Sequence, residues 1–226
     1  EEEKEAGIVL VDIGGGTTDV AIFHEGIIRH TAVIPFGGNV VTQDIRKGCK
    51  ILERHAEKLK IEYGSAHAKE SKENEVVGIP GLKGQEPKEI TLKNLARIIE
   101  ARMVEIIHLV KVQIDTSGYA DEIIGGIVIT GGGSKLKHLT QLFEYHTGFH
   151  SRIGYPCEHL ANENDEHLMS PMYSTGIGLV LKGFEHGNSM RINHNDKGTK
   201  PDKRGKFFDQ VLEKVKEIFG EETEED

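Results

Sequence analysis

Two runs of three glycines, each close behind an apolar run, constrain the fold of this chain more than any other feature. Gly14–Gly16 follows the run Ile8–Ile13, and Gly131–Gly133 follows the run Ile123–Ile129. Apolar runs that are rich in β-branched residues and bounded by glycine are typical of buried strands. Glycine after a strand lets the backbone reach positive φ and leaves no side chain in the way of a ligand. We therefore expect two buried strands, each ending in a turn that a ligand can approach closely.

The first glycine turn lies within a β-meander. The apolar run Val20–Phe23 comes shortly after it, and a third run, Ile27–Ile34, begins after Gly26 and ends before Pro35. Short apolar runs joined by glycine turns are the pattern of antiparallel hairpins. Proline ends a strand because it cannot donate a hydrogen bond to the ladder. The sequence predicts three consecutive antiparallel strands.

Both glycine turns have the features of phosphate-binding loops. Successive backbone N–H groups in such a turn can converge on a phosphate, and the second turn precedes a helical pattern, whose N-terminus favours anions. Asp12, just before the first turn, is placed to hold the water shell of a Mg²⁺ ion that bridges the phosphates. The nucleotide-binding residues expected from the two turns are Gly14, Gly15, Gly16, Thr17, Thr18, Gly131, Gly132, Gly133 and Ser134.

Each turn alone is equally consistent with a tight turn that binds nothing, because short motifs produce many false matches. Neither turn is the GxGxxG sequence of a Rossmann site, since Asp19 and Leu136 occupy the place of the last glycine. The chain also has no GK[ST] sequence of a P-loop. The presence of both turns in one chain favours a nucleotide site of another kind over the ligand-free alternative.

Helical spacing accounts for much of the chain between the two turns and just after the second. Apolar residues recur every three or four positions in Thr42–Tyr63, in Thr91–Ile114 with Thr91 as N-cap, and in Leu136–Gly148. We expect one helix in each of these segments. Residues 65–90 are polar and broken by glycine and proline, with a short strand expected at Val76–Ile79. This stretch is predicted to be a small exposed insertion.

The end of the chain follows a different pattern. Pro171–Leu181 is expected as the last buried element, and residues 185–205 are polar and without apolar period, as in a flexible linker. Residues 206–219 are predicted to form an amphipathic helix before the acidic tail 220–226. At ~1.5 Å per residue the helix is too short to cross a bilayer and suits its surface, with packing on protein as the alternative. Its membrane-facing residues are expected to be Phe207, Phe208, Val211, Leu212, Val215, Ile218 and Phe219.

The charge balance argues against a general nucleic-acid binder. The chain has 28 Lys and Arg against 37 Asp and Glu, a net charge of -9, whereas such binders need clustered basic residues. Cys49 and Cys157 form no CxxC pair, which suits a reducing compartment. No apolar stretch approaches the ~20 residues of a membrane span, and the acidic beginning is unlike a secretory leader. We expect a protein of the cytoplasm with no nucleic-acid partner.

Three motifs, in this order, resemble those of the actin-like ATPase superfamily, which includes actin, heat-shock chaperone ATPases and sugar kinases. The stretch Asp12–Asp19 resembles its second phosphate motif, Thr130–Ser134 its adenosine motif, and Ser174–Gly178 its second connecting motif. The resemblance implies that the chain binds ATP and Mg²⁺ through the residues named above.

Within that superfamily, the chain resembles the FtsA family of bacterial division proteins, on the stretches Ile34–Ile45, Ala56–Lys60 and Tyr63–Gly64. The resemblance implies a protein that self-associates into actin-like filaments and holds the carboxyl-terminal peptide of the tubulin-like FtsZ. It also implies attachment to the cytoplasmic face of the bacterial inner membrane at the division site, and recruitment of downstream division proteins. The alternative is another actin-like ATPase, an MreB-like filament protein or a chaperone ATPase, with no FtsZ-tethering role.

The resemblance also implies an α/β fold, namely an actin-like, ribonuclease-H-like second domain with a mixed β-sheet flanked by helices. The core subdomain is expected at 6–50 and 109–184, with a small inserted α+β subdomain at 51–108. An actin-like fold also has a first domain with its own phosphate hairpin, and this chain begins at the second hairpin. We therefore expect half of the nucleotide cleft and weak ATP affinity for the chain alone. No catalytic residue is assigned, and at most a weak ATPase is expected of the two-domain protein.

Arg102 and Glu105 are the candidate partner-binding residues. They lie three positions apart in the predicted helix and so share one surface of it. The resemblance places this helix beside the groove that takes the FtsZ peptide. The alternative is that both are solvated charges on the outer face of a packed helix.

Overall fold

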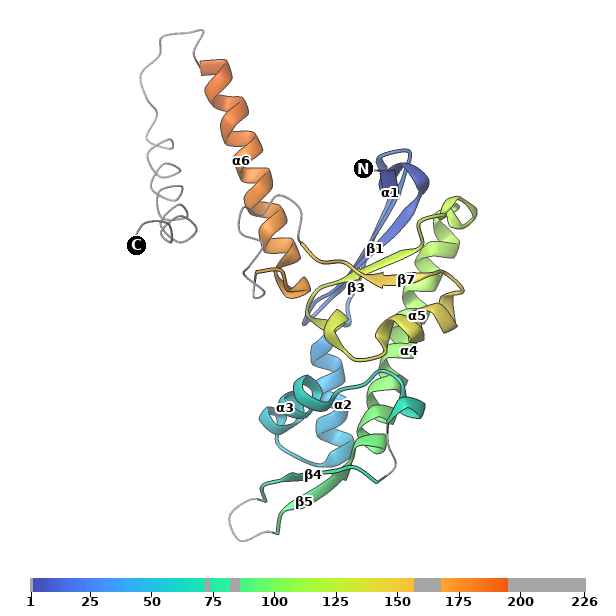
Figure 1. Cartoon of the computed structure of the whole chain (residues 1–226), viewed down its shortest axis with the longest axis vertical. Helices are drawn as coiled ribbons and strands as arrows, with labels where there is room; N and C mark the ends of the chain where they lie inside the picture. The colour runs from blue at the N-terminus through green and yellow to red at the C-terminus, as the bar shows by residue number, and fades with distance from the viewer. Residues whose placement is uncertain (1, 72–73, 82–85, 157–167, 195–226) are drawn as a thin grey trace, which may run out of the picture. The chain divides into compact units, whose positions relative to one another are not determined.

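The computed structural model describes residues 2–71, 74–81, 86–156 and 168–194. Its centre is a five-stranded sheet with the strand order β3-β2-β1-β6-β7 (Figure 1). The predicted β-meander is confirmed, because β1, β2 and β3 pair antiparallel in sequence order. The strands are β1 (Ile8–Ile13), β2 (Thr18–His24), β3 (Ile27–Ile34), β6 (Ile127–Thr130) and β7 (Ser151–Ile153).

The parallel pairing of β1 with β6 decides where the two glycine turns lie. Val11 pairs with Ile129, and Asp12 pairs with Thr130. β6 pairs in parallel with β7 as well, so the sheet is mixed, as predicted. Parallel strands end at the same edge of a sheet. The turns that follow β1 and β6 therefore leave the sheet side by side.

One face of the sheet is covered by α4 (Leu92–Ser117) and α5 (Leu139–Thr147). α4 contacts β2 and β3, α5 contacts β7, and the two helices contact each other. The predicted N-cap is confirmed, since Oγ1 of Thr91 accepts a hydrogen bond from the N–H of Asn94. The apolar stripe that α4 buries consists of Leu95, Ala96, Ile99, Met103, Ile106, Ile107, Val110 and Ile114.

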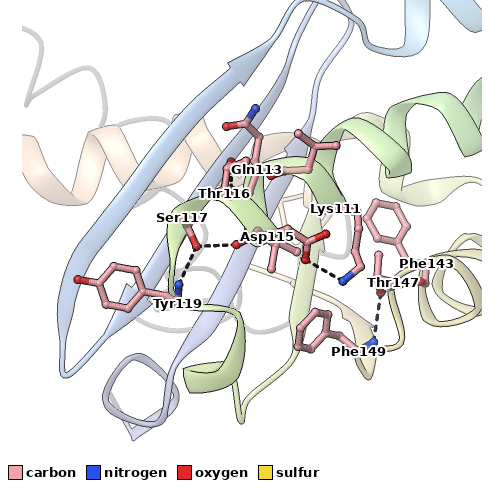
Figure 2. A network of polar contacts seen from close by, with 11 residues as sticks. Lys111, Gln113, Asp115, Thr116, Ser117, Tyr119, Phe143, Thr147 and Phe149 are labelled. Atoms are coloured by element: carbon pink, nitrogen blue, oxygen red, sulfur yellow. Dashed lines mark hydrogen bonds and ion pairs between the residues drawn. The ribbon is translucent and has the colours of Figure 1, made fainter.

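Polar contacts hold the carboxyl-terminal end of α4 (Figure 2). Nζ of Lys111 lies 2.9 Å from Oδ1 of Asp115, one turn further along, and 5.4 Å from the centre of the Phe149 ring. At the end of the helix, Oγ of Ser117 accepts a hydrogen bond from the N–H of Tyr119 at 3.1 Å. Because Phe149 lies between α5 and β7, Lys111 ties α4 to the connection that brings β7 beside β6.

The helix expected over Thr42–Tyr63 is in fact two helices, so that prediction was wrong. α2 spans Gly38–Cys49 and α3 spans Glu53–Tyr63. Lys50 ends α2 in the left-handed conformation, with φ 50° and ψ 55°, and its N–H closes the last turn of α2. A right-handed helix does not continue through such a residue. Apolar residues continue at helical intervals across Lys50, so the sequence pattern gives no sign that the helix ends there.

The predicted short strand at Val76–Ile79 is confirmed as β4, which pairs antiparallel with β5 (Lys88–Thr91). In Figure 1 this hairpin lies at the start of α4, with α2 and α3 beside the same half of the helix. Ile79 and Ile90 are buried in the same apolar core as the strands. The described residues up to Gly178 form one compact unit. A separate subdomain at 51–108 stays a prediction.

Two further elements differ from their prediction. β6 takes only the second half of the strand expected at Ile123–Ile129, because Gly126 just before it has φ 73° and turns the chain. In the element expected to be buried at Pro171–Leu181, Met172 and Tyr173 are 53% and 44% exposed. The start of this segment packs on the turn after β6, where the carbonyl of Pro171 accepts a hydrogen bond from the N–H of Gly131.

The last described helix, α6, spans Ser174–His194, and its residues up to Gly178 belong to the compact unit. It enters the predicted flexible linker 185–205, so residues 185–194 are helical, contrary to that prediction. The sequence of α6 contains no proline, the residue that most strongly breaks a helix, and the first proline after its start is Pro201. Short elements complete the chain, namely α1 (Glu2–Ala6) and 3₁₀ helices at Ala68–Glu70, Ala120–Glu122, Gly132–Lys135 and Pro171–Tyr173.

The predicted amphipathic helix 206–219 and acidic tail 220–226 lie outside the described residues, as does the rest of the linker. The seven apolar residues expected to face the membrane are therefore not placed. Among the helices that the structure describes, none is both long and apolar enough to cross a membrane.

Candidate functional site

The first glycine turn is an exposed hairpin tip. The N–H of Gly14 donates to the carbonyl of Thr17 at 2.9 Å, which closes the turn. The positive φ expected of this turn is not used, because Gly14, Gly15 and Gly16 all have ordinary φ values. The missing side chains matter instead, since a Cβ on Gly16 would meet nothing within 4 Å. The turn therefore presents its backbone openly to a ligand.

The N-terminus of α2 packs against this turn. The N–H groups of Gly38 and Asn39 donate to the carbonyls of Gly14 and Gly15 at 2.9 and 2.8 Å. Gly37 lies so close that a Cβ on it would come within 2.6 Å of the Gly14 carbonyl oxygen. This contact was not predicted, although a pair of adjacent glycines is a signal for close backbone approach. α2 thereby fixes the shape of the turn.

The side-chain hydroxyls of the two threonines of the turn both donate hydrogen bonds to other residues of the chain. Thr18 is fully buried, and its Oγ1 donates to the carbonyl of Phe36 at 2.8 Å. Thr17 is exposed, and its Oγ1 donates to Oδ2 of Asp19 at 3.0 Å. The Thr18 hydroxyl is thus not the ligand donor that was expected, because it bonds β2 to the short connection between β3 and α2. The Thr17 hydroxyl lies at the surface beside the glycines.

The second glycine turn packs directly on the end of β1. Gly131 has φ 81° and ψ 173°, a conformation essentially restricted to glycine. A Cβ on Gly131 would lie 2.2 Å from Oδ1 of Asp12 and 2.6 Å from the carbonyl oxygen of Ile13. A Cβ on Gly133 would lie 2.4 Å from Cγ2 of Ile13. The carboxylate of Asp12 therefore lies against the backbone of the second turn.

The remaining predicted residues of this turn divide into one exposed and one buried residue. Gly132 is exposed. Ser134 is 3% exposed, and its Oγ donates to the carbonyl of Gly131 at 2.7 Å. The Ser134 hydroxyl thus stabilises the turn, and the backbone of Gly132 is the part that faces outward.

The third motif reaches the same point. Oγ1 of Thr175 donates to Oδ2 of Asp12 at 2.6 Å, across 163 residues of sequence. Its neighbour Ser174 has its Oγ 2.7 Å from Oγ1 of Thr130. Thr175 was not among the predicted site residues, because a contact between residues so distant leaves no local sequence pattern. All three motifs therefore meet around Asp12.

A polar cluster of α2 and α3 lies behind the first turn. Nζ of Lys60 donates to the carbonyl of Gly38 at 3.0 Å and to Oγ1 of Thr42 at 2.8 Å, and lies 2.9 Å from Oε2 of Glu57. Burial raises the pKa of Glu57, but hydrogen bonds from Thr42 and Lys60 and the charge of Lys60 outweigh it, so that the pKa is lowered. Beside the cluster is an open pocket lined by Asn39, Thr42, Glu53, Arg54 and Glu57. This cluster was not predicted either.

Arg102 and Glu105 are in contact on α4, as their spacing predicts. Nη1 of Arg102 lies 2.5 Å from Oε2 of Glu105, but its Nε also lies 2.6 Å from Oδ2 of Asp44 on α2. The hydrogen bond to Asp44 raises the pKa of Arg102 more than burial lowers it, and both carboxylates add to the rise. Arg102 is 23% exposed. It is therefore a charged link between two helices rather than a freely solvated side chain.

The arrangement around Asp12 suits an anion together with a hydrated cation. Exposed backbone at the first turn can approach phosphates, and the Asp12 carboxylate is half-buried beside it. Among the residues that the structure describes, no group of three or more His, Cys, Asp or Glu is placed to hold a metal ion. A divalent cation held by Asp12 through water would have water and phosphate oxygens as its other ligands, as Mg²⁺ commonly does.

Solved structures with a similar fold are actin-like proteins. MreB5 of Spiroplasma citri aligns with 84% of this chain and 56% of its own chain, at a TM-score of 0.65 and 23% identity. The PilM–PilN type IV pilus biogenesis complex aligns with 80% of this chain and 47% of its own, at a TM-score of 0.60 and 19% identity. At these identities the likeness shows the fold alone. The predicted actin-like α/β fold is confirmed.

Sequence comparison identifies the family. Cell division protein FtsA of Pseudomonas aeruginosa is 41% identical over 196 residues, which cover 85% of this chain and 46% of the relative. FtsA of Escherichia coli K12 is 36% identical over 194 residues, covering 82% of this chain and 45% of the relative. The chain thus spans about half the length of the curated relatives it matches. The family described as cell division protein FtsA matches residues 9–178, and the chain belongs to this family.

Proposed function

We propose that this chain forms one side of the nucleotide cleft of an ATP-binding, actin-like division protein. The observation that carries the proposal is the meeting of three motifs, since Gly131 and Thr175 both contact Asp12 at the end of the first glycine turn. Such a group offers N–H groups to phosphates and a carboxylate to hydrated Mg²⁺. The fold relative MreB5 supports it, because that protein has been crystallised with AMPPNP and with ADP.

The two glycine turns have different roles in nucleotide binding. The backbone of Gly15 and Gly16 and the hydroxyl of Thr17 face the phosphates, with Gly14 closing the turn. Gly131–Gly133 lines the cleft beside them, and Asp12 holds Mg²⁺ through water. The hydroxyls of Thr18 and Ser134 shape the turns. The other side of the cleft is assigned to a domain outside this chain, so the chain alone is expected to bind ATP weakly.

Replacing Gly16 by valine in the full-length protein is expected to weaken ATP binding about tenfold, or ~1.4 kcal/mol. Its Cβ meets no protein atom within 4 Å, so the fold is spared, but the branched side chain projects where phosphates approach. The measurement is calorimetric titration of ATP in the presence of Mg²⁺. Gly78→Val is the matched control, because a Cβ there also meets nothing within 4 Å and Gly78 lies in β4.

Unchanged ATP affinity in Gly16→Val would contradict the placement of the phosphates at this turn. A micromolar or tighter dissociation constant for the isolated chain would contradict the assignment of half a cleft. Equal losses in Gly16→Val and Gly78→Val would indicate a general effect on folding, and would also count against the site.

We further propose that the protein tethers FtsZ to the cytoplasmic membrane and recruits other division proteins. Membership of the FtsA family supports this role, as does the amphipathic sequence pattern of residues 206–219. The FtsZ carboxyl-terminal peptide is assigned to the outer part of the fold, where Arg102 presents a guanidinium held between α2 and α4. Self-association into actin-like filaments belongs to the same proposal.

Vesicles of phosphatidylglycerol and phosphatidylethanolamine that carry the full-length protein are expected to recruit a labelled FtsZ carboxyl-terminal peptide. Arg102→Glu is expected to lower peptide recruitment about tenfold, because a cation that meets the carboxylates of the peptide becomes an anion. The amount of protein bound to the vesicles should be the same for Arg102→Glu and the wild type. Removal of residues 206–226 is expected to release protein and peptide together. Co-sedimentation measures both quantities.

Asp44→Asn is the control that separates partner binding from structure. It removes the partner of Arg102 on α2 but keeps the guanidinium, so peptide recruitment should stay near the wild-type level. A loss in Asp44→Asn as large as that in Arg102→Glu would show that the link between the helices matters, and would refute the direct contact. Binding of the truncated protein to vesicles would refute the membrane assignment.

The alternative of an MreB-like or chaperone ATPase without an FtsZ role is not favoured. The likeness to MreB5 shows only the fold, at 23% identity, whereas FtsA relatives reach 41% identity over most of this chain. Failure of the full-length protein to bind the FtsZ peptide in the vesicle experiment would revive that alternative.

A further inference from the structure

We infer that Thr175 is a positioning residue, which orients the carboxylate of Asp12 toward a hydrated divalent cation bound with the nucleotide. The inference rests on the proposed nucleotide function and assigns a role to Thr175, which lies in the third motif but was not among the predicted site residues. Its basis is a hydrogen bond of 2.6 Å from Oγ1 of Thr175 to Oδ2 of Asp12. This length is typical of a hydroxyl donating to an ionised carboxylate, one of the stronger hydrogen bonds in proteins.

One oxygen of the Asp12 carboxylate is hydrogen-bonded, and the other lies close against Gly131. Oδ2 accepts from Thr175, and Oδ1 lies where a Cβ on Gly131 would come within 2.2 Å of it. The backbone of Asp12 is fixed as well, since it pairs with Asp19 on β2 and with Thr130 on β6. With the backbone fixed, the side-chain torsions are the remaining freedom, and the Thr175 hydroxyl restrains them.

Thr175 itself is presented by a segment anchored to the second turn. The N–H of Gly131 donates to the carbonyl of Pro171 at 3.2 Å, and the hydroxyls of Thr130 and Ser174 are 2.7 Å apart. These bonds do not involve the Thr175 hydroxyl. Removing that hydroxyl should therefore leave the segment in place and affect the carboxylate alone.

A carboxylate that acts on a hydrated cation should matter only when the cation is present. Partners that orient such a ligand typically contribute ten- to a hundredfold, or about one to two orders of magnitude, in metal affinity. Thr175→Val has the same shape without the hydroxyl. We expect it to raise the Mg²⁺ concentration needed for half-maximal ATP binding by about tenfold, the lower end of that range. ATP binding in EDTA should be unchanged.

The experiment is equilibrium dialysis of labelled ATP against the full-length protein, with Mg²⁺ titrated from zero. Thr175→Ser keeps the hydroxyl and should restore the wild-type Mg²⁺ midpoint. Ser174→Ala is the matched control, since it removes the neighbouring hydroxyl that contacts Thr130 instead of Asp12. It should lower thermal stability while leaving the Mg²⁺ midpoint unchanged.

Three results would overturn the inference. A wild-type Mg²⁺ midpoint in Thr175→Val would show that the hydroxyl does not act on the cation. Equal losses of ATP binding with Mg²⁺ and in EDTA would show a merely structural role. If the wild-type protein binds no ATP under any condition, the proposed nucleotide function fails and the inference fails with it, which distinguishes that result from the other two.

Discussion

Replacing Gly131 by alanine is expected to lower the free energy of unfolding by about 4 kcal/mol, the sum of strain and overpacking at one position. The residue has φ 81° and ψ 173°, which alanine adopts only with strain. Its new Cβ would lie 2.2 Å from Oδ1 of Asp12 and 2.6 Å from the carbonyl oxygen of Ile13. Asp12 can rotate away, but the Ile13 carbonyl belongs to β1 and cannot move without disturbing the sheet.

The measurement is urea unfolding followed by circular dichroism, because the chain has no tryptophan for fluorescence. Gly132→Ala is the matched control in the same turn. Its Cβ would lie 3.9 Å from the nearest atom, on Met172, so its stability should stay within about 0.5 kcal/mol of the wild type. A loss below about 1 kcal/mol in Gly131→Ala, less than either cost alone usually contributes, would show that the two turns are not packed together.

The glycine turns themselves were predictable, because their signal is local. Gly14–Gly16 and Gly131–Gly133 each follow an apolar run, and an apolar run bounded by glycine or proline marks a buried strand. The bounds of β1 and β3 follow the sequence pattern, although only β1 is a largely buried strand and β3 is mostly exposed or half-buried. α4 was predictable in the same way, because its apolar spacing and the Thr91 N-cap both lie within the helix.

The break between α2 and α3 was not predictable from spacing. Ile45, Cys49, Leu52 and Ala56 continue at helical intervals across it, and Lys50 takes a left-handed conformation that usually belongs to glycine. The stability of that break comes from tertiary packing of the two helices, which contact each other. Periodicity reports which residues are buried, but not whether the backbone between them stays helical.

The parts of the candidate site that were missed depend on contacts between distant residues. Thr175 reaches Asp12 only because β1 pairs with β6 and the chain returns to their ends much later. The Thr18 hydroxyl was expected to face a ligand, but it donates its hydrogen bond to the Phe36 carbonyl once β2 and β3 pair. Sequence motifs indicate which residues gather at a site, whereas the fold decides which atoms stay free.

Replacing Lys60 by methionine is expected to lower the free energy of unfolding by about 2 kcal/mol at neutral pH, part of the cost of breaking a buried pair. The Lys60 side chain is 13% exposed and bonds to the Gly38 carbonyl, Thr42 and Glu57. Methionine keeps the apolar stem but leaves Glu57 without its cation. The expected loss is smaller than that for a fully buried pair, because Glu57 is 42% exposed and water screens its charge.

The loss in Lys60→Met should shrink at acid pH. The lowered pKa of Glu57 in the folded protein means that its carboxylate stabilises the fold above the unfolded pKa of about 4.3. That contribution disappears in the wild type as pH falls through the lower folded pKa, whereas the variant has already lost the pairing with Lys60. Urea unfolding at pH 7 and at acid pH measures the difference between the two proteins.

Lys58→Met supplies the control on the same helix. Lys58 is 68% exposed, and its Nζ lies 3.7 Å from Oε1 of Glu62, so its removal should cost less than about 0.5 kcal/mol at either pH. A Lys60→Met loss that matches Lys58→Met, or that does not change with pH, would mean that Glu57 and Lys60 are effectively solvated. In that case the start of α2 would owe its position to the backbone bonds between Gly14, Gly15 and the first residues of the helix alone.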